Sequence, residues 1–223
     1  MSANSNQAYN RGFQDFYGRD FLVTKNVLIP RPETESIIDI VKSLAGKPIL
    51  PGVKAPAPKI KETAKILDVG TGSGCIAITV KKELPEAIVT GVDIKKSALE
   101  IAEKNAKKLG ANVDFRQSDL LENIGKDYDI IIANLPYVDP EWDWLDKEAL
   151  SIEPSIALYA ADHGLALIKK LIDQAKENPP EYLILEADPC QHEEIKNYAT
   201  KNGFRHLETR GFAILFSWNT HQE

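Results

Sequence analysis

The stretch that decides the fold occupies residues 67–74 and reads LDVGTGSG. Its first residues complete an apolar run and a segment of helical period follows at residues 75–84, so the stretch joins a strand to a helix. Because glycine has no Cβ, the three glycines let the backbone turn tightly and approach a ligand at the helix N-terminus. We therefore expect a unit of strand, loop and helix that holds a ligand at residues 70–74.

Short apolar runs alternate with segments of helical period along the rest of the chain. This alternation is typical of βαβ units and a mainly parallel sheet. Residues 128–133, YDIIIA, are apolar enough for a strand covered on both faces, and the last two apolar runs, split by Arg210 and Gly211, predict a closing antiparallel hairpin. The expected strands are 66–69, 88–92, 113–116, 128–133, 182–186, 205–209 and 212–218, and the expected helices are 75–84, 95–109, 164–178 and 191–202.

The residues before this unit predict a smaller N-terminal element. Residues 16–29 read as two short strands around Lys25 and Asn26, and residues 32–44 read as a helix with Pro32 in its first position. A connector rich in proline and lysine follows, and it sustains neither a helical nor a strand period. We therefore divide the chain into an N-terminal tail, β-hairpin and helix (1–46), a connector (47–65) and a main α/β domain (66–223).

Composition limits the partners and the compartment. The 223 residues include 27 Lys plus Arg against 33 Asp plus Glu, a net charge of −6, which favours a protein or small-molecule substrate over direct nucleic-acid binding. The two cysteines, Cys75 and Cys190, form no CxxC pair and no cluster with histidine, so neither a disulfide scaffold nor a metal site is expected. The polar N-terminus lacks the apolar run of a signal peptide, and no stretch approaches the roughly 20 apolar residues of a membrane span. We expect a cytoplasmic protein with no membrane segment.

A carboxylate after the second expected strand indicates the ligand of the glycine loop. Asp93 lies about twenty residues beyond the loop, where a carboxylate can accept hydrogen bonds from both ribose hydroxyls of an adenosine. A dinucleotide fingerprint needs a third small residue where this chain has Cys75, and this departure favours S-adenosylmethionine over NAD. The alternative is a structural glycine turn in an α/β protein that binds no nucleoside.

Two further aspartates have two possible roles each. Asp68, at the start of the loop, can receive the ammonium group of the ligand or fix the loop through backbone N–H groups. Asp119, after the third strand, can meet the adenine amino group while Leu120 packs on the ring, or it can be a solvated loop residue. The expected cofactor-binding residues are Asp68, Gly70, Thr71, Gly72, Ser73, Gly74, Asp93, Asp119, Leu120 and Asn134.

The most informative tetrapeptide is Asn134-Leu135-Pro136-Tyr137, at the carboxyl end of the strand YDIIIA. A conjugated NH2 group is a poor nucleophile because its lone pair is delocalised, and positive charge grows on its nitrogen as it attacks a methyl group. Hydrogen-bond acceptors aimed at that nitrogen stabilise the charge. The side-chain oxygen of Asn134 and the carbonyl of Leu135 can each accept one N–H. Pro136 stiffens the turn and the Tyr137 ring can stack on the planar group, so no strong base is needed. A proline turn that merely ends a strand is the alternative.

Four segments, in this order, resemble the HemK-type protein-(glutamine) methyltransferases. The resemblance implies a class I methyltransferase fold, Rossmann-like and doubly wound, with seven strands. It implies that S-adenosylmethionine methylates the side-chain amide nitrogen of the glutamine in the GGQ motif of peptide chain release factors. It also implies cofactor contacts from residues 70–74, Asp93, Asp119, Leu120 and Asn134, a glutamine site at residues 134–137, and a turn at residues 31–34 near the methionine end of the cofactor. The segments are FYGRDFLVTKNVLIPRPETE (16–35), ILDVGTGSG (66–74), NLPYV (134–138) and EPSIALYAADHGL (153–165).

The chain departs from the family pattern at three places. Leu135 replaces the first proline of N-P-P-Y, residues 211–214 read GFAI where the family has GRDR, and we expect the N-terminal helical bundle that helps to dock the release factor to be absent. The expected protein is a monomer whose partner is a release factor. Two alternatives stay open: an N6-adenine RNA methyltransferase, because N-L-P-Y is typical of ribosomal adenine dimethylases, and a cofactor-binding scaffold without turnover, because of the missing bundle and the altered C-terminus.

Overall fold

A twisted sheet forms the centre of the computed structural model, which describes residues 2–50, 54, 56–125, 127–145 and 150–219. Within these residues the sheet has seven strands in the order β5-β4-β3-β6-β7-β9-β8. Neighbouring strands from β5 to β7 pair in parallel, and β9 runs antiparallel to both β7 and β8. The expected mainly parallel sheet and its antiparallel C-terminal hairpin are therefore confirmed. The strands are β3 (Lys65–Val69), β4 (Ile88–Asp93), β5 (Asp114–Gln117), β6 (Ile130–Ala133), β7 (Tyr182–Glu186), β8 (Phe204–Arg210) and β9 (Ala213–Trp218).

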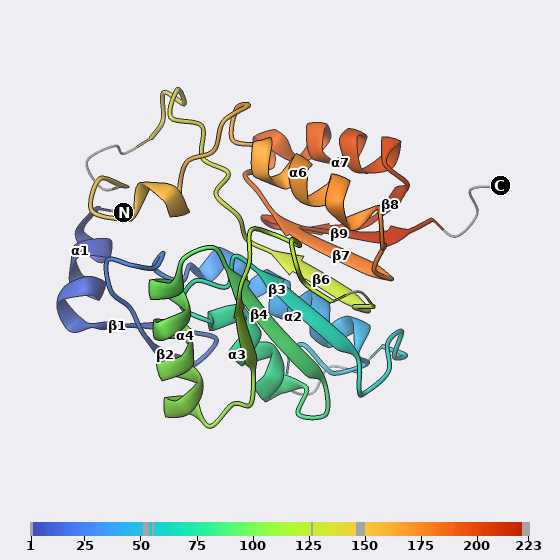
Figure 1. The fold of residues 1–223 in the computed structure, drawn as a ribbon, viewed down its shortest axis with the longest axis horizontal. Helices are drawn as coiled ribbons and strands as arrows, with labels where there is room; N and C mark the ends of the chain where they lie inside the picture. Colours follow the sequence, from blue (N-terminus) through green and yellow to red (C-terminus); the bar gives the residue numbers. More distant parts are fainter. Residues whose placement is uncertain (1, 51–53, 55, 126, 146–149, 220–223) are drawn as a thin grey trace.

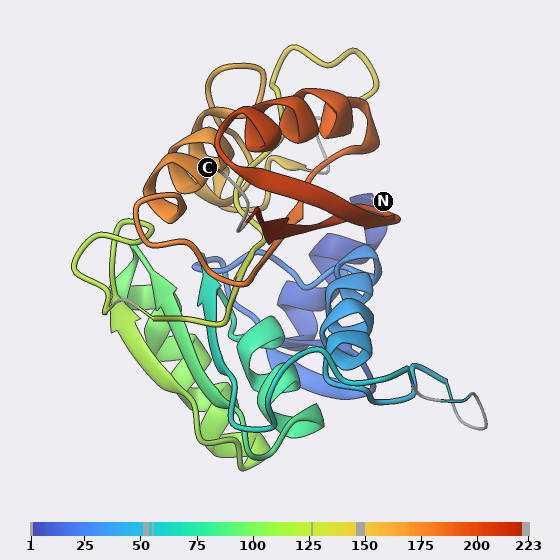
Figure 2. The ribbon, with the colours of Figure 1, turned by 90° about the vertical axis from the view of Figure 1, so that its right-hand side faces the viewer.

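Helices cover both faces of the sheet, because alternate strand residues point to opposite sides. In β6, for example, Ile130 and Ile132 join the hydrophobic cluster under α2 and α3, whereas Ile131 and Ala133 join the cluster under α6 and α7. Figures 1 and 2 show these two helical layers with the sheet between them. The doubly wound architecture is thereby confirmed. The helices are α2 (Glu35–Leu44), α3 (Cys75–Glu83), α4 (Lys96–Leu109), α6 (Ala166–Ala175) and α7 (His192–Lys201).

The N-terminal hairpin lies earlier in the chain than expected. Its strands are β1 (Phe13–Phe16) and β2 (Arg19–Leu22), so the predicted turn at Lys25-Asn26 is wrong. The chain instead reverses at Tyr17 and Gly18, both at positive φ (53° and 70°), the geometry of a tight hairpin turn. The last residue of β2 is held by α4, because Leu22 donates its N–H to the Asn105 side chain over 2.7 Å. Residues 23–31 thus leave the hairpin as a loop.

The expected N-terminal tail contains a helix, α1 (Ser2–Arg11). Its last turns pack on the loop after β2: Ala8 is fully buried beside Val23 and Val27, and the Tyr9 hydroxyl donates to the Val27 carbonyl over 2.9 Å. The polar sequence of this segment has a weak helical pattern, so these tertiary contacts stabilise a helix that propensity alone does not indicate. The helix expected over residues 32–44 begins as a 3-10 turn, Pro32–Thr34, and continues as α2.

The hairpin and α2 share a hydrophobic core with the sheet. Phe16, Phe21 and Ile37 are fully buried in the same cluster as Ile66 of β3 and Ile130 of β6. The division of the chain at residues 47–65 stays a prediction. No helix within the described part of the chain is long and apolar enough to cross a membrane.

Two isoleucines on strands give a matched test of this core. Ile132 of β6 is fully buried, whereas Ile88 at the start of β4 is 55% exposed. Replacing Ile132 by alanine should lower the free energy of unfolding by about 2–5 kcal/mol, through lost burial and the cavity left behind. Ile88→Ala should cost less than about 1 kcal/mol. Urea denaturation of both variants measures the difference, and equal losses would contradict the two-faced burial of β6.

Candidate active site

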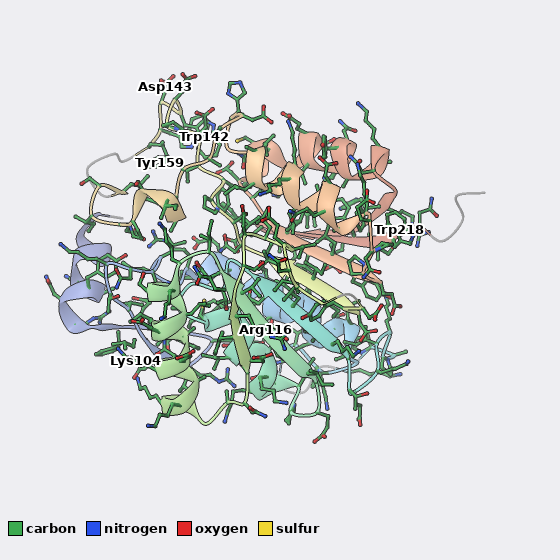
Figure 3. All side chains as sticks on the ribbon, viewed as in Figure 1. Lys104, Arg116, Trp142, Asp143, Tyr159 and Trp218 are labelled. Carbon is green, nitrogen blue, oxygen red and sulfur yellow. The ribbon has the colours of Figure 1, made fainter. Side chains whose placement is uncertain are left out.

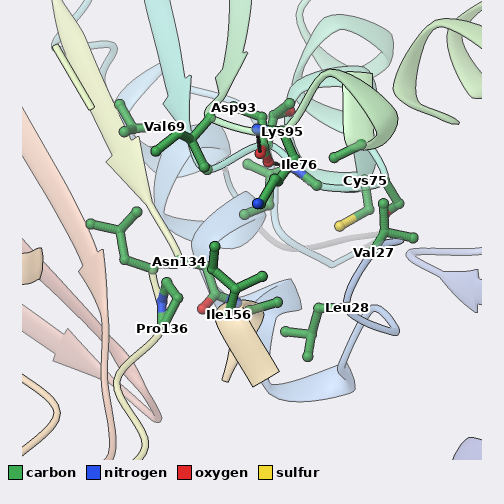
Figure 4. Close-up of a pocket in the computed structure, with 18 of the residues that line it drawn as sticks. Val27, Leu28, Val69, Cys75, Ile76, Asp93, Lys95, Asn134, Pro136 and Ile156 are labelled. Atoms are coloured by element: carbon green, nitrogen blue, oxygen red, sulfur yellow. Dashed lines mark hydrogen bonds between the residues drawn. The ribbon is translucent and has the colours of Figure 1, made fainter. Parts of the chain in front are cut away.

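A cavity lies at the carboxyl ends of β3, β4 and β6 (Figure 4). In a doubly wound sheet the chain leaves β3 and β6 toward opposite faces, so a crevice forms between the loops that follow these two strands. The walls come from segments far apart in the sequence. Their cavity-lining parts are residues 26–31 and Thr34, residues 69–73, Cys75 and Ile76, residues 93–95 and Ala98, residues 118–120, residues 134–136, and Ile156, Ala157 and Leu167.

The glycine loop presents its backbone to this cavity. Gly70 and Gly72 adopt positive φ angles (74° and 54°), and the backbone N–H groups of Gly70 and Thr71 both donate to the Val92 carbonyl. A Cβ on Gly70 would lie 3.0 Å from the Leu135 side chain, so a side chain at this position would press on the loop after β6. Thr71 and Ser73 also line the cavity.

Gly74 does not line the cavity, although its place in the glycine loop predicts a contact with the ligand. A Cβ at this position would lie 2.9 Å from the Ile78 side chain and 3.1 Å from that of Ala102. Its positive φ of 80° begins α3 at the point where this helix packs on α4. In the structure Gly74 therefore serves close packing of α3 against α4.

Asp68 lies behind the loop rather than in the cavity lining. Its buried carboxylate accepts a hydrogen bond from the Thr71 hydroxyl over 2.6 Å and another from the Ala77 N–H over 3.2 Å. Its second oxygen has no hydrogen-bond partner among the described residues. Burial raises the pKa of Asp68 to about 7, although both hydrogen bonds oppose this rise. Of its two expected roles, bracing the loop is the one that these contacts support.

Asp93 and Asp119 both line the cavity. Backbone N–H groups hold the Asp93 carboxylate, whereas a lysine side chain contacts Asp119. The Asp93 carboxylate accepts the Lys95 N–H on one oxygen (2.8 Å) and the Gly72 N–H on the other (3.0 Å). Burial nevertheless raises the pKa of Asp93. Each of its oxygens retains a lone pair that can accept another hydrogen bond. Asp119 accepts a hydrogen bond from Lys170 over 2.8 Å, and Leu120 beside it is buried with φ at 50°.

The first three residues of the tetrapeptide after β6 line the cavity, and the fourth does not. Asn134, Leu135 and Pro136 line the cavity, and Figure 4 shows Asn134 and Pro136 on its wall. Tyr137 does not line it. Its ring is partly buried against the hydrophobic cluster under α6 and α7, and its hydroxyl lies 3.5 Å from Oε1 of Glu186. Burial, followed by the charge of Glu186, raises the pKa of Tyr137.

Backbone contacts hold Tyr137 in place. Its carbonyl accepts a hydrogen bond from Nε2 of Gln191 over 2.8 Å, and the same nitrogen donates to the His163 carbonyl over 2.8 Å. Gly164 allows this approach, since a Cβ there would lie 1.9 Å from the Tyr137 oxygen. The loop after Tyr137 is thus tied to the segment that precedes α6.

Two buried residues, Thr34 and Glu186, are linked to Asn134 by hydrogen bonds. Thr34 belongs to the turn that the family resemblance places near the cofactor, whereas Glu186 is not among the site residues expected from the sequence. The side-chain nitrogen of Asn134 donates to the Thr34 hydroxyl over 3.1 Å, and that hydroxyl donates to Oε1 of Glu186 over 3.1 Å. Burial raises the pKa of Glu186 to about 7, while its hydrogen bonds with Thr34 and Tyr137 lower it. The signal in the sequence is an acidic residue that ends the continuous apolar run YLILE at 182–186.

An ion pair joins two of the cavity walls. The Arg31 guanidinium pairs with the buried carboxylate of Glu153, which also accepts the Ile29 N–H over 3.4 Å. Residues 29–31 are thereby tied to the segment that carries Ile156 and Ala157, both of which line the cavity. The turn at residues 31–34 contributes Arg31 and Thr34 to this wall.

A surface loop projects beyond Tyr137. Figure 3 shows Trp142, Asp143 and Tyr159 in this part of the molecule. The rings of Trp142 and Trp144 stack with their centroids 5.2 Å apart. The Nδ1 atom of His163 lies 2.9 Å from Asp139, and this pair raises the pKa of His163. The loop therefore has polar and aromatic contacts of its own, outside the cavity.

The residues around the cavity fit S-adenosylmethionine. The half-buried carboxylate of Asp93 at the end of β4 suits ribose hydroxyls, and apolar side chains such as Ile94 and Leu120 suit the faces of a purine. Gly70 has no side chain, and a Cβ at this position would lie 3.0 Å from the Leu135 side chain on the opposite wall. This chemistry matches a nucleoside, whose planar base can pack against apolar side chains while its sugar hydroxyls donate to a carboxylate.

The burial of Asp68 should make stability depend on pH between about 4 and about 7. Because its pKa is raised in the folded state, the folded protein keeps a proton that the unfolded chain releases in this window. The free energy of unfolding therefore falls as the pH rises. Asp68→Asn removes this contribution, so its stability relative to the wild type should rise between about pH 5 and about pH 7, by at most about 1.4 kcal/mol per pH unit. Urea denaturation at several pH values measures this, and parallel pH curves for the two proteins would contradict it.

Comparison with known proteins gives the family. The methyltransferase small domain family matches residues 52–146. The release factor glutamine methyltransferase of Koribacter versatilis is 42% identical over 85% of this chain and 66% of its own length. The enzyme of the same name from Neisseria gonorrhoeae is 36% identical over 90% of this chain and 70% of its own length.

The chain thus spans about two thirds of the length of these two relatives. A methyltransferase structure from Pyrococcus furiosus superposes with a TM-score of 0.66 at 16% identity, covering 97% of this chain and 98% of that one, which confirms the class I methyltransferase fold. The chain belongs to the release factor glutamine methyltransferase family, whose members are S-adenosylmethionine-dependent N-methyltransferases.

Proposed function

We propose that this chain methylates the side-chain amide nitrogen of the glutamine in the GGQ motif of a peptide chain release factor. The observation that carries the proposal is the position of Asn134. It lines the cavity at the end of β6 while its side-chain nitrogen is engaged by Thr34. Its oxygen is therefore the atom of the amide group that remains to accept a hydrogen bond. The names of the relatives support a release factor as the partner.

The chemistry of the acceptor explains why such an oxygen matters. An amide nitrogen is weakly nucleophilic, and methyl transfer places positive charge on it. When bound, S-adenosylmethionine supplies an electrophilic methyl group on a sulfonium. The oxygen of Asn134 and the carbonyl of Leu135 accept the two N–H bonds of the glutamine, which orients the nitrogen and stabilises the growing charge. Pro136 restrains the turn between the cavity and Tyr137.

The proposed cofactor site uses the rest of the cavity wall. Asp93 accepts the ribose hydroxyls, the backbone of residues 70–73 borders the cofactor, and Asp119 and Leu120 flank the base. Asp68 and Gly74 act from behind the wall, because neither lines the cavity and both hold the loop against α3 or α4. The turn at residues 31–34 borders the cavity through Arg31 and Thr34.

Removing the acceptor oxygen should abolish most of the methyl transfer. Asn134→Ala is expected to lower kcat by about 100- to 1,000-fold, because it removes one preorganised acceptor from the transition state. The measurement is transfer of tritiated methyl groups to a purified release factor, with the modified residue identified by mass spectrometry. A release factor with its GGQ glutamine replaced by alanine is the control. If the wild-type enzyme labels this altered factor as strongly as the natural one, the assignment of the substrate is wrong.

Replacing the carboxylate at the end of β4 should weaken cofactor binding. Asp93→Asn keeps the shape of the side chain but replaces one charged acceptor oxygen with a donor nitrogen. We expect the Kd for S-adenosylmethionine to rise by about 10- to 100-fold, as for loss of a hydrogen bond to a charged group. Isothermal titration calorimetry measures this, with circular dichroism to verify folding.

Asp114→Asn provides the matched control, because Asp114 lies on the neighbouring strand β5 and pairs with Arg116 at the surface. The control should bind the cofactor like the wild type. Unchanged binding by Asp93→Asn would place the ribose elsewhere in the cavity.

A further inference from the structure

A series of hydrogen-bonded side chains extends from Asn134 into the protein interior. The chemistry of methyl transfer does not by itself account for these hydrogen bonds. Asn134 donates to Thr34, Thr34 donates to Glu186, and the Tyr137 hydroxyl lies 3.5 Å from the same Glu186 oxygen. Thr34 and Glu186 are 2% and 1% exposed. They come from opposite ends of the chain, so the fold itself brings them to the carboxyl end of β6. We name Thr34 and Glu186 together the brace.

The direction of each hydrogen bond in this series follows from the carboxylate. An ionised carboxylate can only accept, so the Thr34 hydroxyl must donate its proton to Glu186. The Thr34 oxygen then has only lone pairs to offer Asn134. It can bind the NH2 group of the Asn134 amide and not the oxygen. The buried charge of Glu186 therefore sets the orientation of the Asn134 amide through the Thr34 hydroxyl, and its own interaction with Asn134 favours the same orientation.

We propose that Glu186, acting through Thr34, is a positioning residue that fixes the amide of Asn134 so that its oxygen, and not its nitrogen, faces the methyl acceptor. The inference rests on the proposed function, because it gives the Asn134 oxygen its role. A flipped amide would present two N–H groups to the N–H groups of the substrate, and neither could accept. The brace thus excludes the flipped orientation of the Asn134 amide, which has nearly the same shape but cannot support the reaction.

The surroundings of Glu186 bring its protonation equilibrium close to neutral pH. The groups facing it are Thr34 and Glu33 from the turn before α2, Asn134 and Tyr137 from the segment after β6, and Cys75 from the start of α3. No ion pair with a Lys, Arg or His side chain within the described chain compensates its charge, and its second oxygen has no hydrogen-bond partner there. Burial accordingly raises its pKa to about 7. A protonated Glu186 could donate a hydrogen bond to Thr34. It would then no longer determine which group donates and which accepts in the hydrogen bonds from Glu186 to Asn134.

Three substitutions test the brace at constant shape. Thr34→Val removes the hydroxyl from an isosteric side chain, Thr34→Ser keeps it, and Glu186→Gln replaces the acceptor-only group with one that can also donate. We expect kcat for methyl transfer to fall by about 10-fold or more in Thr34→Val and Glu186→Gln, and to stay within about 3-fold of the wild type in Thr34→Ser. The Kd for S-adenosylmethionine should change by less than about 3-fold in all three. Equal loss in Thr34→Ser and Thr34→Val would overturn the proposal.

A double-mutant comparison separates positioning from general damage. If the brace acts through Asn134, adding Thr34→Val to Asn134→Ala should not lower the residual activity further. An additional 10-fold loss in the double variant would mean that Thr34 acts independently, which would overturn the proposal. The rate should also rise with pH through about 7 in the wild type, as Glu186 ionises, and this limb should be missing in Glu186→Gln. Its persistence in Glu186→Gln would exclude Glu186 as the ionising group.

A measurement without substrate keeps this inference distinct from the proposed function. In the isotope-labelled protein, the side-chain NH2 signals of Asn134 are assigned by their absence in Asn134→Ala. They should shift with pH around 7 in the wild type and lose this dependence in Glu186→Gln and Thr34→Val. Signals unaffected by both substitutions would overturn the brace. Failure of the wild type to methylate a release factor, with these signals as expected, would instead count against the substrate assignment.

Discussion

The parallel pairing of β3 with β6 is the constraint on which the site depends. Their register places Val69 opposite Ala133, so the glycine loop and the Asn134 turn leave the sheet side by side. The contact is close enough that a Cβ on Gly70 would press on Leu135 at 3.0 Å. The backbone hydrogen bonds between β3 and β6 thereby hold the glycine loop and the Asn134 turn at one crevice.

The site contains two buried carboxylates, and their burial lowers the stability of the fold. Asp68 and Glu186 both have raised pKa values because the protein replaces water with apolar neighbours, and each leaves one oxygen without a partner among the described residues. Such groups lower stability and are found where function requires fixed geometry. Asp68 fixes the glycine loop to the first turn of α3, and Glu186 holds the Thr34 hydroxyl against Asn134. The hydrophobic clusters on both faces of the sheet stabilise the fold against this cost.

The N-terminal residues are part of the site, because they line the cavity and contact Asn134. Residues 26–31 and Thr34 line one wall of the cavity, and the Thr34 side chain contacts Asn134 at the end of β6. Arg31 ties this wall to Glu153 in the segment between β6 and α6. The family resemblance includes both of these segments, and the structure gives a physical reason: each contributes a side chain to a contact that the glycine loop and the tetrapeptide cannot make alone.

The α/β architecture, the seven strands of the main sheet, the helices α3, α4, α6 and α7, and the loops that follow β3 and β6 can be predicted from the sequence alone. These features rest on local periodicity, on glycines with positive φ and on the rule that ligands bind at the carboxyl ends of parallel strands. Tertiary structure decided the rest. The hairpin turns at Tyr17-Gly18 and not at Lys25-Asn26, and residues 2–11 form a helix, because contacts with α4 and with Val27 stabilise conformations that local patterns leave undecided. The partnership of Thr34 with Glu186 joins residues 152 positions apart, and no local pattern records which buried hydroxyl will meet which buried carboxylate.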